Sequence, residues 1–172
     1  MKMSRARYQF ELAQSEQEIR DYFAVRRAIF CEEQQIFSGH DIDDIDQYAF
    51  PIVALDTEMN NQVAGIVRIY ESEPNVWYGG RLGVSMDYRR AGRLGKGLIY
   101  KAVTTAHGWG CTKFLATVQL QNVRFFKRQH WHSLEEISIC DRPHHLMEAD
   151  LDFYPPAENE RPQLDLSMWQ AS

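Results

Sequence analysis

The sequence lacks a long hydrophobic run, an excess of positive charge and a dense set of cysteines. No stretch approaches the ~20 apolar residues of a membrane-spanning helix, so we expect no membrane segment. The net charge is -5 with a pI near 5.7, whereas nucleic-acid-binding domains usually carry a basic face. Met1 to Phe10 has basic residues but no apolar run after them, unlike a secretory signal. We therefore expect a cytoplasmic protein that binds neither nucleic acid nor membrane.

The cysteines and histidines have no metal-binding pattern. Cys31, Cys111 and Cys140 form an odd, widely spaced set, which indicates reduced thiols, and their apolar surroundings are typical of small buried residues. Four histidines and Cys140 crowd the C-terminal third, but no Cys-x2-Cys or His-x3-His pair occurs there. We expect no metal site.

The length of 172 residues and the 44% hydrophobic content indicate one globular domain. A chain of this size buries roughly 70% of the surface of its unfolded form, so its core needs no disulfides. We place the domain at residues 1–154 and a tail at 155–172, which begins with a proline-rich segment. Apolar residues follow in the tail (Leu164, Leu166, Met168 and Trp169), so we expect it to dock on the domain or at a subunit contact, with a homodimer as one possibility.

Hydrophobic periodicity predicts one central sheet with helices, an α+β or mixed α/β fold. The predicted strands are Tyr8–Leu12, Phe50–Leu55, Val63–Glu71, Val76–Val84, Phe114–Val118, Ile137–Cys140 and His145–Leu151. The predicted helices are Glu16–Glu33, Gly95–Gly108 and a short helix from Asn122 to near His130. Ser15 and Glu18 have the spacing of a capping box at the start of the first helix.

The stretch from Leu82 to Leu98 carries the clearest chemical signal. A strand leads into a glycine-bearing turn with Arg89, Arg90, Arg93 and Lys96, and the turn opens a helix. Free N–H groups at a helix start bind anions, and a pyrophosphate is the natural guest. A basic surface turn capped by glycine explains the same residues equally well. A Walker loop is excluded, because Gly97 follows Lys96 where Ser or Thr is needed.

Several motifs together resemble the GNAT N-acetyltransferase superfamily. Val84-x3-Tyr88-Arg89 with Gly92, Gly95 and Gly97 resembles its coenzyme A-binding motif, with a loop one residue longer. The run Phe114–Trp131 resembles its strand and Asn-led helix, which ends in aromatic residues. Arg27–Gln34 with the spaced Asp43 and Asp46, and Pro143-His144-x2-Met147, are similar to the ElaA-like branch. The resemblance covers roughly residues 10–151 and implies a mostly antiparallel mixed sheet flanked by helices.

The resemblance implies acetyl transfer from acetyl-CoA to a primary amine by direct attack, without a metal. Leu82, Gly83 and Val84 would pair with the pantetheine arm, and Asn122, Phe125 and Phe126 would line the distal side of the cofactor. The pyrophosphate would be held by the turn, through Arg89, Arg90, Ala91, Gly92, Arg93, Leu94, Gly95 and Lys96.

Glu33, Asp46 and His144 are the candidates for the general base. Without a catalytic role, Glu33 would be a solvated surface carboxylate and Asp46 part of a solvated or helix-capping loop. His144 would be a buried, hydrogen-bonded histidine. Phe30 and Asp43 are expected to contact the acceptor, because the four aspartates of 41–46 would attract a small cationic amine.

The proton donor to the departing thiolate is less clear. Phe126 stands where many family members place a tyrosine for this task; Tyr100 and Tyr154 are possible substitutes. An alternative function is therefore a non-catalytic domain that senses acyl-CoA or binds a partner. Acyl-homoserine-lactone synthesis is disfavoured, because the tryptophan-rich N-terminus of that related fold is missing.

Overall fold

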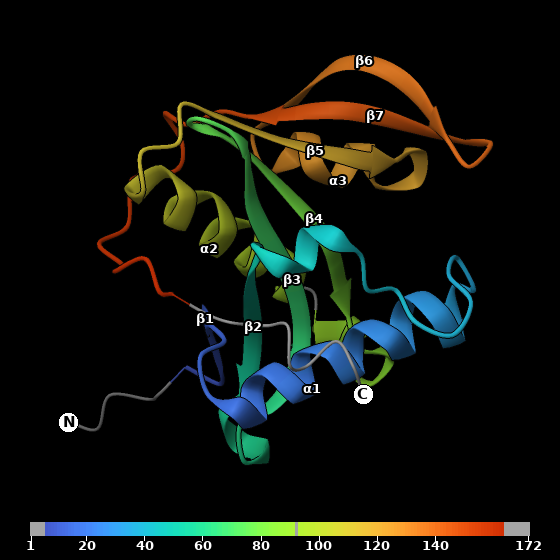
Figure 1. Cartoon of the computed structure of the whole chain (residues 1–172), viewed down its shortest axis with the longest axis vertical. Helices are drawn as coiled ribbons and strands as arrows, with labels where there is room; N and C mark the ends of the chain where they lie inside the picture. The colour runs from blue at the N-terminus through green and yellow to red at the C-terminus, as the bar shows by residue number, and fades with distance from the viewer. Residues whose placement is uncertain (1–5, 92, 164–172) are drawn as a thin grey trace. The chain divides into compact units, whose positions relative to one another are not determined.

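The structure is a computed structural model that describes residues 6–91 and 93–163 (Figure 1). The described strands are β1 (Tyr8–Leu12), β2 (Phe50–Asp56), β3 (Gln62–Glu73), β4 (Val76–Val84), β5 (Lys113–Gln119), β6 (Trp131–Ile139) and β7 (Arg142–Ala149). The α-helices are α1 (Glu16–Arg27), α2 (Leu94–Gly108) and α3 (Val123–Arg128). Five short helical segments complete the described elements: η1 (Ala28–Glu33), η2 (Asp44–Gln47), η3 (Thr57–Met59), η4 (Met86–Ala91) and η5 (Leu120–Asn122).

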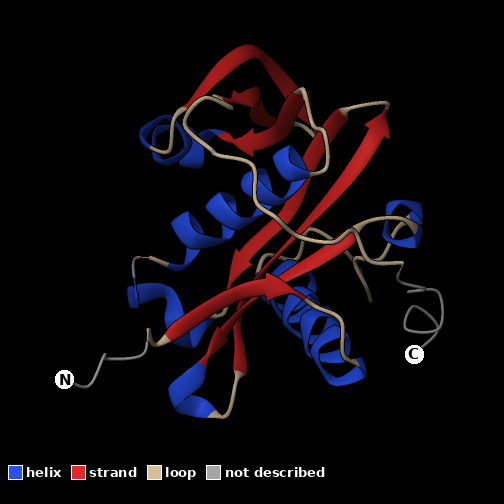
Figure 2. Ribbon diagram, turned by 90° about the vertical axis from the view of Figure 1, so that its left-hand side faces the viewer, coloured by secondary structure: helices blue, strands red, loops and turns tan. Residues whose placement is uncertain are grey.

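The seven strands form one mixed sheet in the order β1-β2-β3-β4-β5-β7-β6. The strands are drawn in red in Figure 2. β1 pairs antiparallel with β2, and β7 pairs antiparallel with both β5 and β6. The parallel pairing of β4 with β5 covers Val76–Tyr78 and Lys113–Leu115. This mixed, mostly antiparallel sheet confirms the predicted α+β class. None of the described helices combines the length and the apolar character needed to cross a membrane.

The described chain forms two compact units, and β3 and β4 each have residues in both. The first unit comprises the described residues of 6–68, 81–101 and 162–163, and the second comprises 69–80 and 102–161. In the first unit α1 begins with the predicted capping box: Ser15 Oγ accepts from the Glu18 N–H, and the Glu18 carboxylate accepts from the Ser15 N–H. Ile19 and Tyr22 of α1 are buried in a core cluster with Val53 and Ile66.

The end of the first helix differs from its prediction. The α-helix stops at Arg27, and the predicted remainder is the π-helical segment η1. There the Gln34 N–H donates to the Ile29 carbonyl five residues earlier, at 2.9 Å. Ile29 and Phe30 of η1 remain buried, so hydrophobic periodicity alone could not separate the two helix types. π-Helical turns occur frequently at functional sites.

The hairpin of the second unit corrects two predicted strands. β6 begins at Trp131, six residues before the predicted start, and β7 runs from Arg142 to Ala149 instead of His145–Leu151. The turn falls at Cys140-Asp141, with φ angles of 50° and 61°, as a tight two-residue hairpin requires. The first half of β6 was missed because its residues are mostly exposed and polar, so they lack an apolar alternation. Cys140 is exposed rather than buried, which corrects its predicted setting.

Residues 155–161 of the predicted tail pack on the second unit. The Ala157 N–H donates to the Thr104 carbonyl at 2.9 Å, and the Trp109 indole donates to the Asn159 carbonyl at 2.7 Å. The guanidinium carbon of Arg161 lies 5.0 Å from the centre of the Trp77 ring. The apolar tail residues Leu164, Leu166, Met168 and Trp169 lie outside the described residues.

A carboxylate pair in the first unit makes stability depend on pH. A hydrogen bond with Glu18, partial burial and the Glu18 charge raise the pKa of Glu11 to about 7. Although burial opposes it, hydrogen bonds from Glu11 and from Ser15 lower the pKa of Glu18. Between about 4.5, the ordinary value for Glu11, and about 7, the folded chain holds a proton at Glu11 that the unfolded chain has lost. Stability should therefore fall as pH rises through this window.

The Glu11→Gln variant should lose this dependence, because an amide does not titrate. Urea denaturation at pH 5, 6 and 7 measures the slope, and Glu16→Gln on the exposed face of α1 is the control. A slope for Glu11→Gln equal to that of the wild type would contradict the assignment.

Candidate active site

The predicted anion-binding turn is present as a strand, a short helix and a longer helix in succession. β4 ends at Val84, η4 follows, and the 15-residue α2 begins at Leu94. The turn is held by its backbone, since the Ser85 N–H donates to the Ala64 carbonyl at 2.9 Å and the Tyr88 N–H to the Ser85 carbonyl at 2.8 Å. The predicted ligand Gly92 lies outside the described residues.

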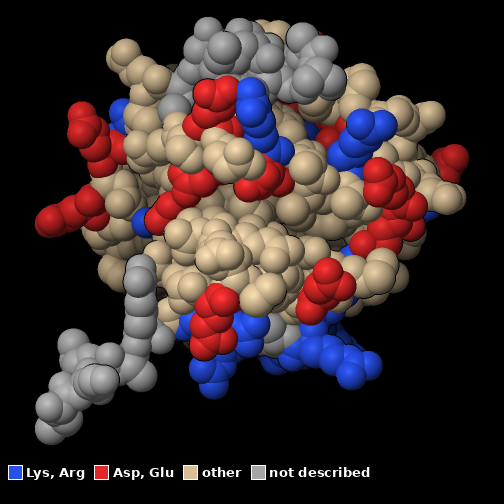
Figure 3. All heavy atoms as spheres, turned by 90° about the horizontal axis from the view of Figure 1, so that it is seen from below, with Lys and Arg blue, Asp and Glu red and all other residues tan. Residues whose placement is uncertain are grey.

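Four basic side chains surround this turn. Arg89, Arg90, Arg93 and Lys96 are all exposed, in a chain whose net charge is -5. The start of α2 adds its free N–H groups and the positive end of the helix dipole. On the face drawn in Figure 3, Lys and Arg side chains gather along the lower edge beside acidic side chains, and both kinds are mixed over the upper part. The turn therefore has the features of an anion site.

The strand that leads to the turn lies close to η1. A Cβ on Gly83 would lie 2.8 Å from the Ile29 side chain, and 3.7 Å from the Phe30 ring. Glycine at this position therefore allows β4 to approach η1 closely. Phe30, predicted to contact the acceptor, is 8% exposed and belongs to the core cluster.

Two predicted site residues are partners of each other. The Arg89 guanidinium forms a two-point ion pair with the Glu33 carboxylate. Both side chains are partly exposed, at 43% for Arg89 and 24% for Glu33. This ion pair must therefore break before Glu33 can act as a base or Arg89 can bind a phosphate.

A cavity of about 420 Å³ adjoins the start of the turn. Its walls are apolar residues of α1 and η1 together with two carboxylates and the first residues after β4: Ala24, Val25, Ala28, Ile29, Glu32, Glu33, Ser85 and Met86. Glu32 is exposed, and Met86 is 65% exposed. The lining of the cavity therefore combines apolar side chains with two carboxylates.

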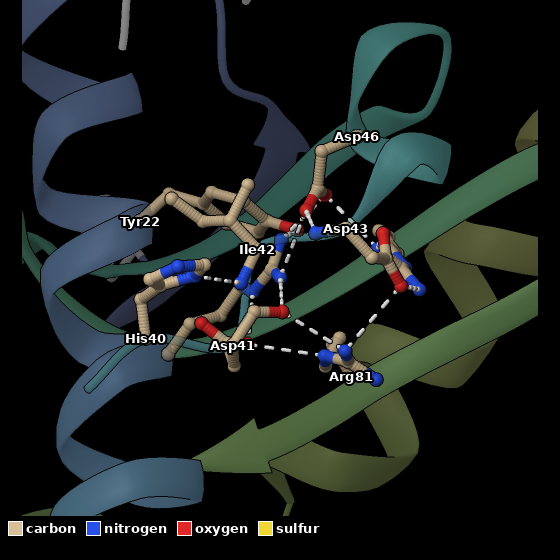
Figure 4. A network of polar contacts seen from close by, with 9 residues as sticks. Tyr22, His40, Asp41, Ile42, Asp43, Asp46 and Arg81 are labelled. Atoms are coloured by element: carbon tan, nitrogen blue, oxygen red, sulfur yellow. Dashed lines mark hydrogen bonds and ion pairs between the residues drawn. The ribbon is translucent and has the colours of Figure 1, made fainter. Parts of the chain in front are cut away.

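The acidic loop is bound to three arginines that the sequence analysis did not single out (Figure 4). Arg26 donates to Asp41 at 2.8 Å and to Asp46 at 2.7 Å. Arg68 contacts Asp43 at 2.6 Å and Asp46 at 3.0 Å, and Arg81 contacts Asp41 at 3.0 Å. One signal could have revealed Arg68, since a guanidinium inside the apolar run of β3 requires acidic partners.

This network changes the interpretation of the loop. Three carboxylates face three guanidiniums, so Asp41, Asp43 and Asp46 do not form an uncompensated negative patch. Asp46 is 1% exposed and also accepts from the backbone N–H of Asp43. Although partial burial opposes it, the hydrogen bond from Arg68 keeps the pKa of Asp43 below its ordinary value. Asp41, Asp43 and Asp46 are thus parts of a structural network, whereas Asp44 is exposed.

The remaining predicted site residues belong to the second unit. Asn122 precedes α3 as its N-cap residue, without a side-chain capping bond. Phe126 is buried, with its ring edge-on to Trp131 at 5.2 Å and to Phe125 at 6.0 Å. His144 is 8% exposed, and its Nδ1 donates to the Arg142 carbonyl at 2.9 Å. Its Nε2 is then the nitrogen that can accept a proton.

Of the two tyrosines considered as proton donors, Tyr154 is committed to the fold. Its hydroxyl donates to the Gln129 carbonyl and accepts from the Trp131 indole. Burial raises the pKa of Tyr154 to about 12. Tyr100 is 45% exposed on α2. Of the two, Tyr100 is therefore the one whose side chain is accessible.

Comparison with known proteins places this arrangement in a family. Residues 14–131, more than half of the chain, match the acetyltransferase (GNAT) family. The uncharacterized N-acetyltransferase YjcF of Bacillus subtilis is 31% identical over 142 residues, which cover 81% of this chain and 97% of that protein. The chain belongs to the GNAT family.

Solved structures show the same GNAT fold. Escherichia coli ElaA superposes with a TM-score of 0.70 at 23% identity, over 83% of this chain and 98% of that one. An acyl-CoA N-acyltransferase from Pseudomonas aeruginosa superposes with a TM-score of 0.70 at 19% identity, over the same shares. At these identities the similarity establishes the fold, and the GNAT motif identified in the sequence corresponds to the turn between β4 and α2.

Proposed function

We propose that this GNAT protein transfers an acetyl group from acetyl-CoA to the primary amine of a small cationic molecule. The observation that carries the proposal is the turn between β4 and α2. Four exposed basic side chains surround a helix start there, in a chain of net negative charge. A pyrophosphate needs backbone N–H donors and positive charge, and the turn offers both.

The end of β4, just before the turn, also supports acetyl-CoA as the acyl donor. The described β4–β5 pairs end at Tyr78, whereas β4 continues to Val84. Leu82, Gly83 and Val84 would pair with the amides of the pantetheine arm. Arg89 would exchange the Glu33 carboxylate for a phosphate oxygen, which releases Glu33 at the edge of the cavity.

The proposed reaction is direct attack of a neutral amine on the thioester carbonyl carbon. The C–N bond forms, the C–S bond breaks, the amine loses one proton and the thiolate leaves. Positioning and backbone N–H contacts to the developing oxyanion supply most of the acceleration. Asp46 is a poor candidate for the base, because Arg26 and Arg68 occupy its carboxylate. His144, through Nε2, and Glu33 remain the proposed bases.

The proposal that the acceptor is cationic rests on Glu32 and Glu33, and not on the aspartates of 41–46 from which the sequence analysis predicted it. Three of the four aspartates of the loop, Asp41, Asp43 and Asp46, are balanced by arginines, so the loop is not a patch of four free negative charges. Glu32 and Glu33 line the cavity instead, and Glu32 is exposed. Negative charge at the edge of a hollow would draw an ammonium group towards this face.

Calorimetric titration with acetyl-CoA and free coenzyme A tests the donor site. The wild type should bind both, and Arg90→Glu/Lys96→Glu should weaken binding about 100-fold or more, because each charged hydrogen bond contributes about 1.5–3 kcal/mol. Arg20→Glu/Lys113→Glu is the charge-matched control, since both of its residues are exposed outside the turn.

A screen of amines for thiol release then tests transfer. Release with cationic primary amines would support the enzyme. Tight coenzyme A binding without release from any amine would favour an acyl-CoA-sensing domain, which the buried Phe126 would suit because it has no proton to donate. No binding at millimolar ligand would contradict the proposed donor.

A further inference from the structure

One side chain ties the turn to the sheet. The Tyr88 hydroxyl donates a hydrogen bond to Asp56 Oδ2 at 2.8 Å. Tyr88 lies in η4, two residues before Arg90, whereas Asp56 is the last residue of β2. Both residues are buried, at 8% exposed for Tyr88 and 0% for Asp56. A buried hydroxyl that donates to a carboxylate makes a short, strong contact.

Asp56 is held in the sheet independently of the turn. The Arg7 guanidinium donates to both carboxylate oxygens at 3.1 Å, and the Glu58 N–H donates to Oδ1 at 3.1 Å. Asp56 also pairs with Tyr8 in the β1–β2 register. The carboxylate is therefore a fixed point to which the turn attaches.

Tyr88 is a buried attachment of η4. Its neighbours Met86, Asp87, Arg89 and Arg90 are all exposed. The Tyr88 ring also meets the Tyr8 ring edge-on at 6.2 Å, so packing and hydrogen bonding point the same way. The path of the backbone at Arg89 and Arg90 therefore depends on where Tyr88 is held.

At neutral pH the Tyr88 hydroxyl and the Asp56 carboxylate have the protonation states that this hydrogen bond requires. Burial and the Asp56 carboxylate raise the pKa of Tyr88 to about 12, so the phenol keeps its proton. The hydrogen bond from Arg7 is the largest influence on Asp56 and lowers its pKa, so the carboxylate stays charged. Donor and acceptor are thus both in the required state.

We infer that Tyr88 is a positioning residue for the acyl-donor site, which holds the pyrophosphate-binding turn in place through Asp56. The inference rests on the proposed function, in which this turn binds the donor. A preorganised set of N–H donors binds an anion more tightly than a mobile one, because less ordering is needed on binding. Tyr88 acts through the turn and need not touch the donor.

Comparison of Tyr88→Phe with Tyr22→Phe tests this role. Both variants remove the hydroxyl of a buried tyrosine of the first unit, but only the first removes the attachment of the turn, because the Tyr22 hydroxyl accepts from Arg26 instead. Calorimetry with coenzyme A should show an affinity about tenfold weaker for Tyr88→Phe and within twofold of wild type for Tyr22→Phe. In acyl transfer, Tyr88→Phe should raise the KM for the donor about tenfold and change kcat less than twofold.

Hydrogen exchange without ligand provides a readout that does not depend on activity. The amides of Tyr88 and Gly97, which are bonded to the Ser85 and Arg93 carbonyls, should exchange at least tenfold faster in Tyr88→Phe and at an unchanged rate in Tyr22→Phe. Equal exchange and equal affinity for Tyr88→Phe and wild type would overturn the inference. An equal affinity loss in both variants would also overturn it, because stability alone would then explain the effect. Faster exchange in a protein that binds no coenzyme A would uphold the positioning and refute the proposed donor.

Discussion

Replacement of Arg26 by methionine is expected to lower the free energy of unfolding by about 3–5 kcal/mol. Arg26 is 0% exposed, and its guanidinium contacts Asp41, Asp46 and the Tyr22 hydroxyl. Methionine fills similar space but leaves two buried carboxylates with one arginine partner fewer. The loss comes mainly from this uncompensated burial of charge, and it does not measure the net contribution of the intact network.

Urea denaturation of Arg26→Met against wild type measures this effect. Arg20→Met on the same helix is the control, because Arg20 is 58% exposed and pairs with Glu16 near the surface. An exposed pair of this kind contributes at most about 0.5 kcal/mol. A loss below about 1 kcal/mol for Arg26→Met would show that the buried carboxylates find other partners or take up protons.

Substitution of Gly97 by valine is expected to destabilise the protein by about 3 kcal/mol through overpacking. A Cβ at this position in the first turns of α2 would lie 2.1 Å from the Phe10 ring of β1, well inside van der Waals contact. We interpreted this glycine as part of the coenzyme A motif. The structure gives it a second task, which is to let β1 approach the helix.

A double-mutant cycle with Phe10→Ala tests this explanation. The cost of Gly97→Val should fall by at least half in the Phe10→Ala background, because the clashing ring is gone. Denaturation midpoints of the four proteins give the coupling. Equal costs of Gly97→Val in both backgrounds would locate the strain elsewhere, for example in the helix backbone.

Much of the fold could be predicted because its signals are local. The capping box of Ser15 and Glu18 is contained within four residues, and it placed the start of α1 correctly. The strand Val76–Val84 was predicted with the bounds that the structure shows. The turn before α2 follows from glycines and basic residues that are adjacent in the sequence. Each of these patterns depends only on near neighbours in the chain.

The first half of β6 and the π-helical end of the first helix could not be predicted in this way. Ser133 and Glu135 to Glu136 gain strand geometry by pairing with β7, and a bulge at Ser133/Glu135 interrupts the register. Propensity in an exposed strand is weak compared with the hydrogen bonds that a partner strand offers. The shift from α to π at Ala28 leaves Ile29 and Phe30 buried, as an α-helix also would.

The sequence by itself determined the family, the order of the elements and the place of the anion-binding turn, because motif spacing and periodicity are read along the chain. Only the tertiary structure decided what the acidic loop does. Asp41 meets Arg26 and Arg81, which lie 15 and 40 residues away, and Asp46 meets Arg68 at a separation of 22 residues. The partner of a charge depends on distance in space, so three of the four aspartates that resemble a cation-attracting patch in sequence form a neutralised network with three arginines, whereas Asp44 is exposed.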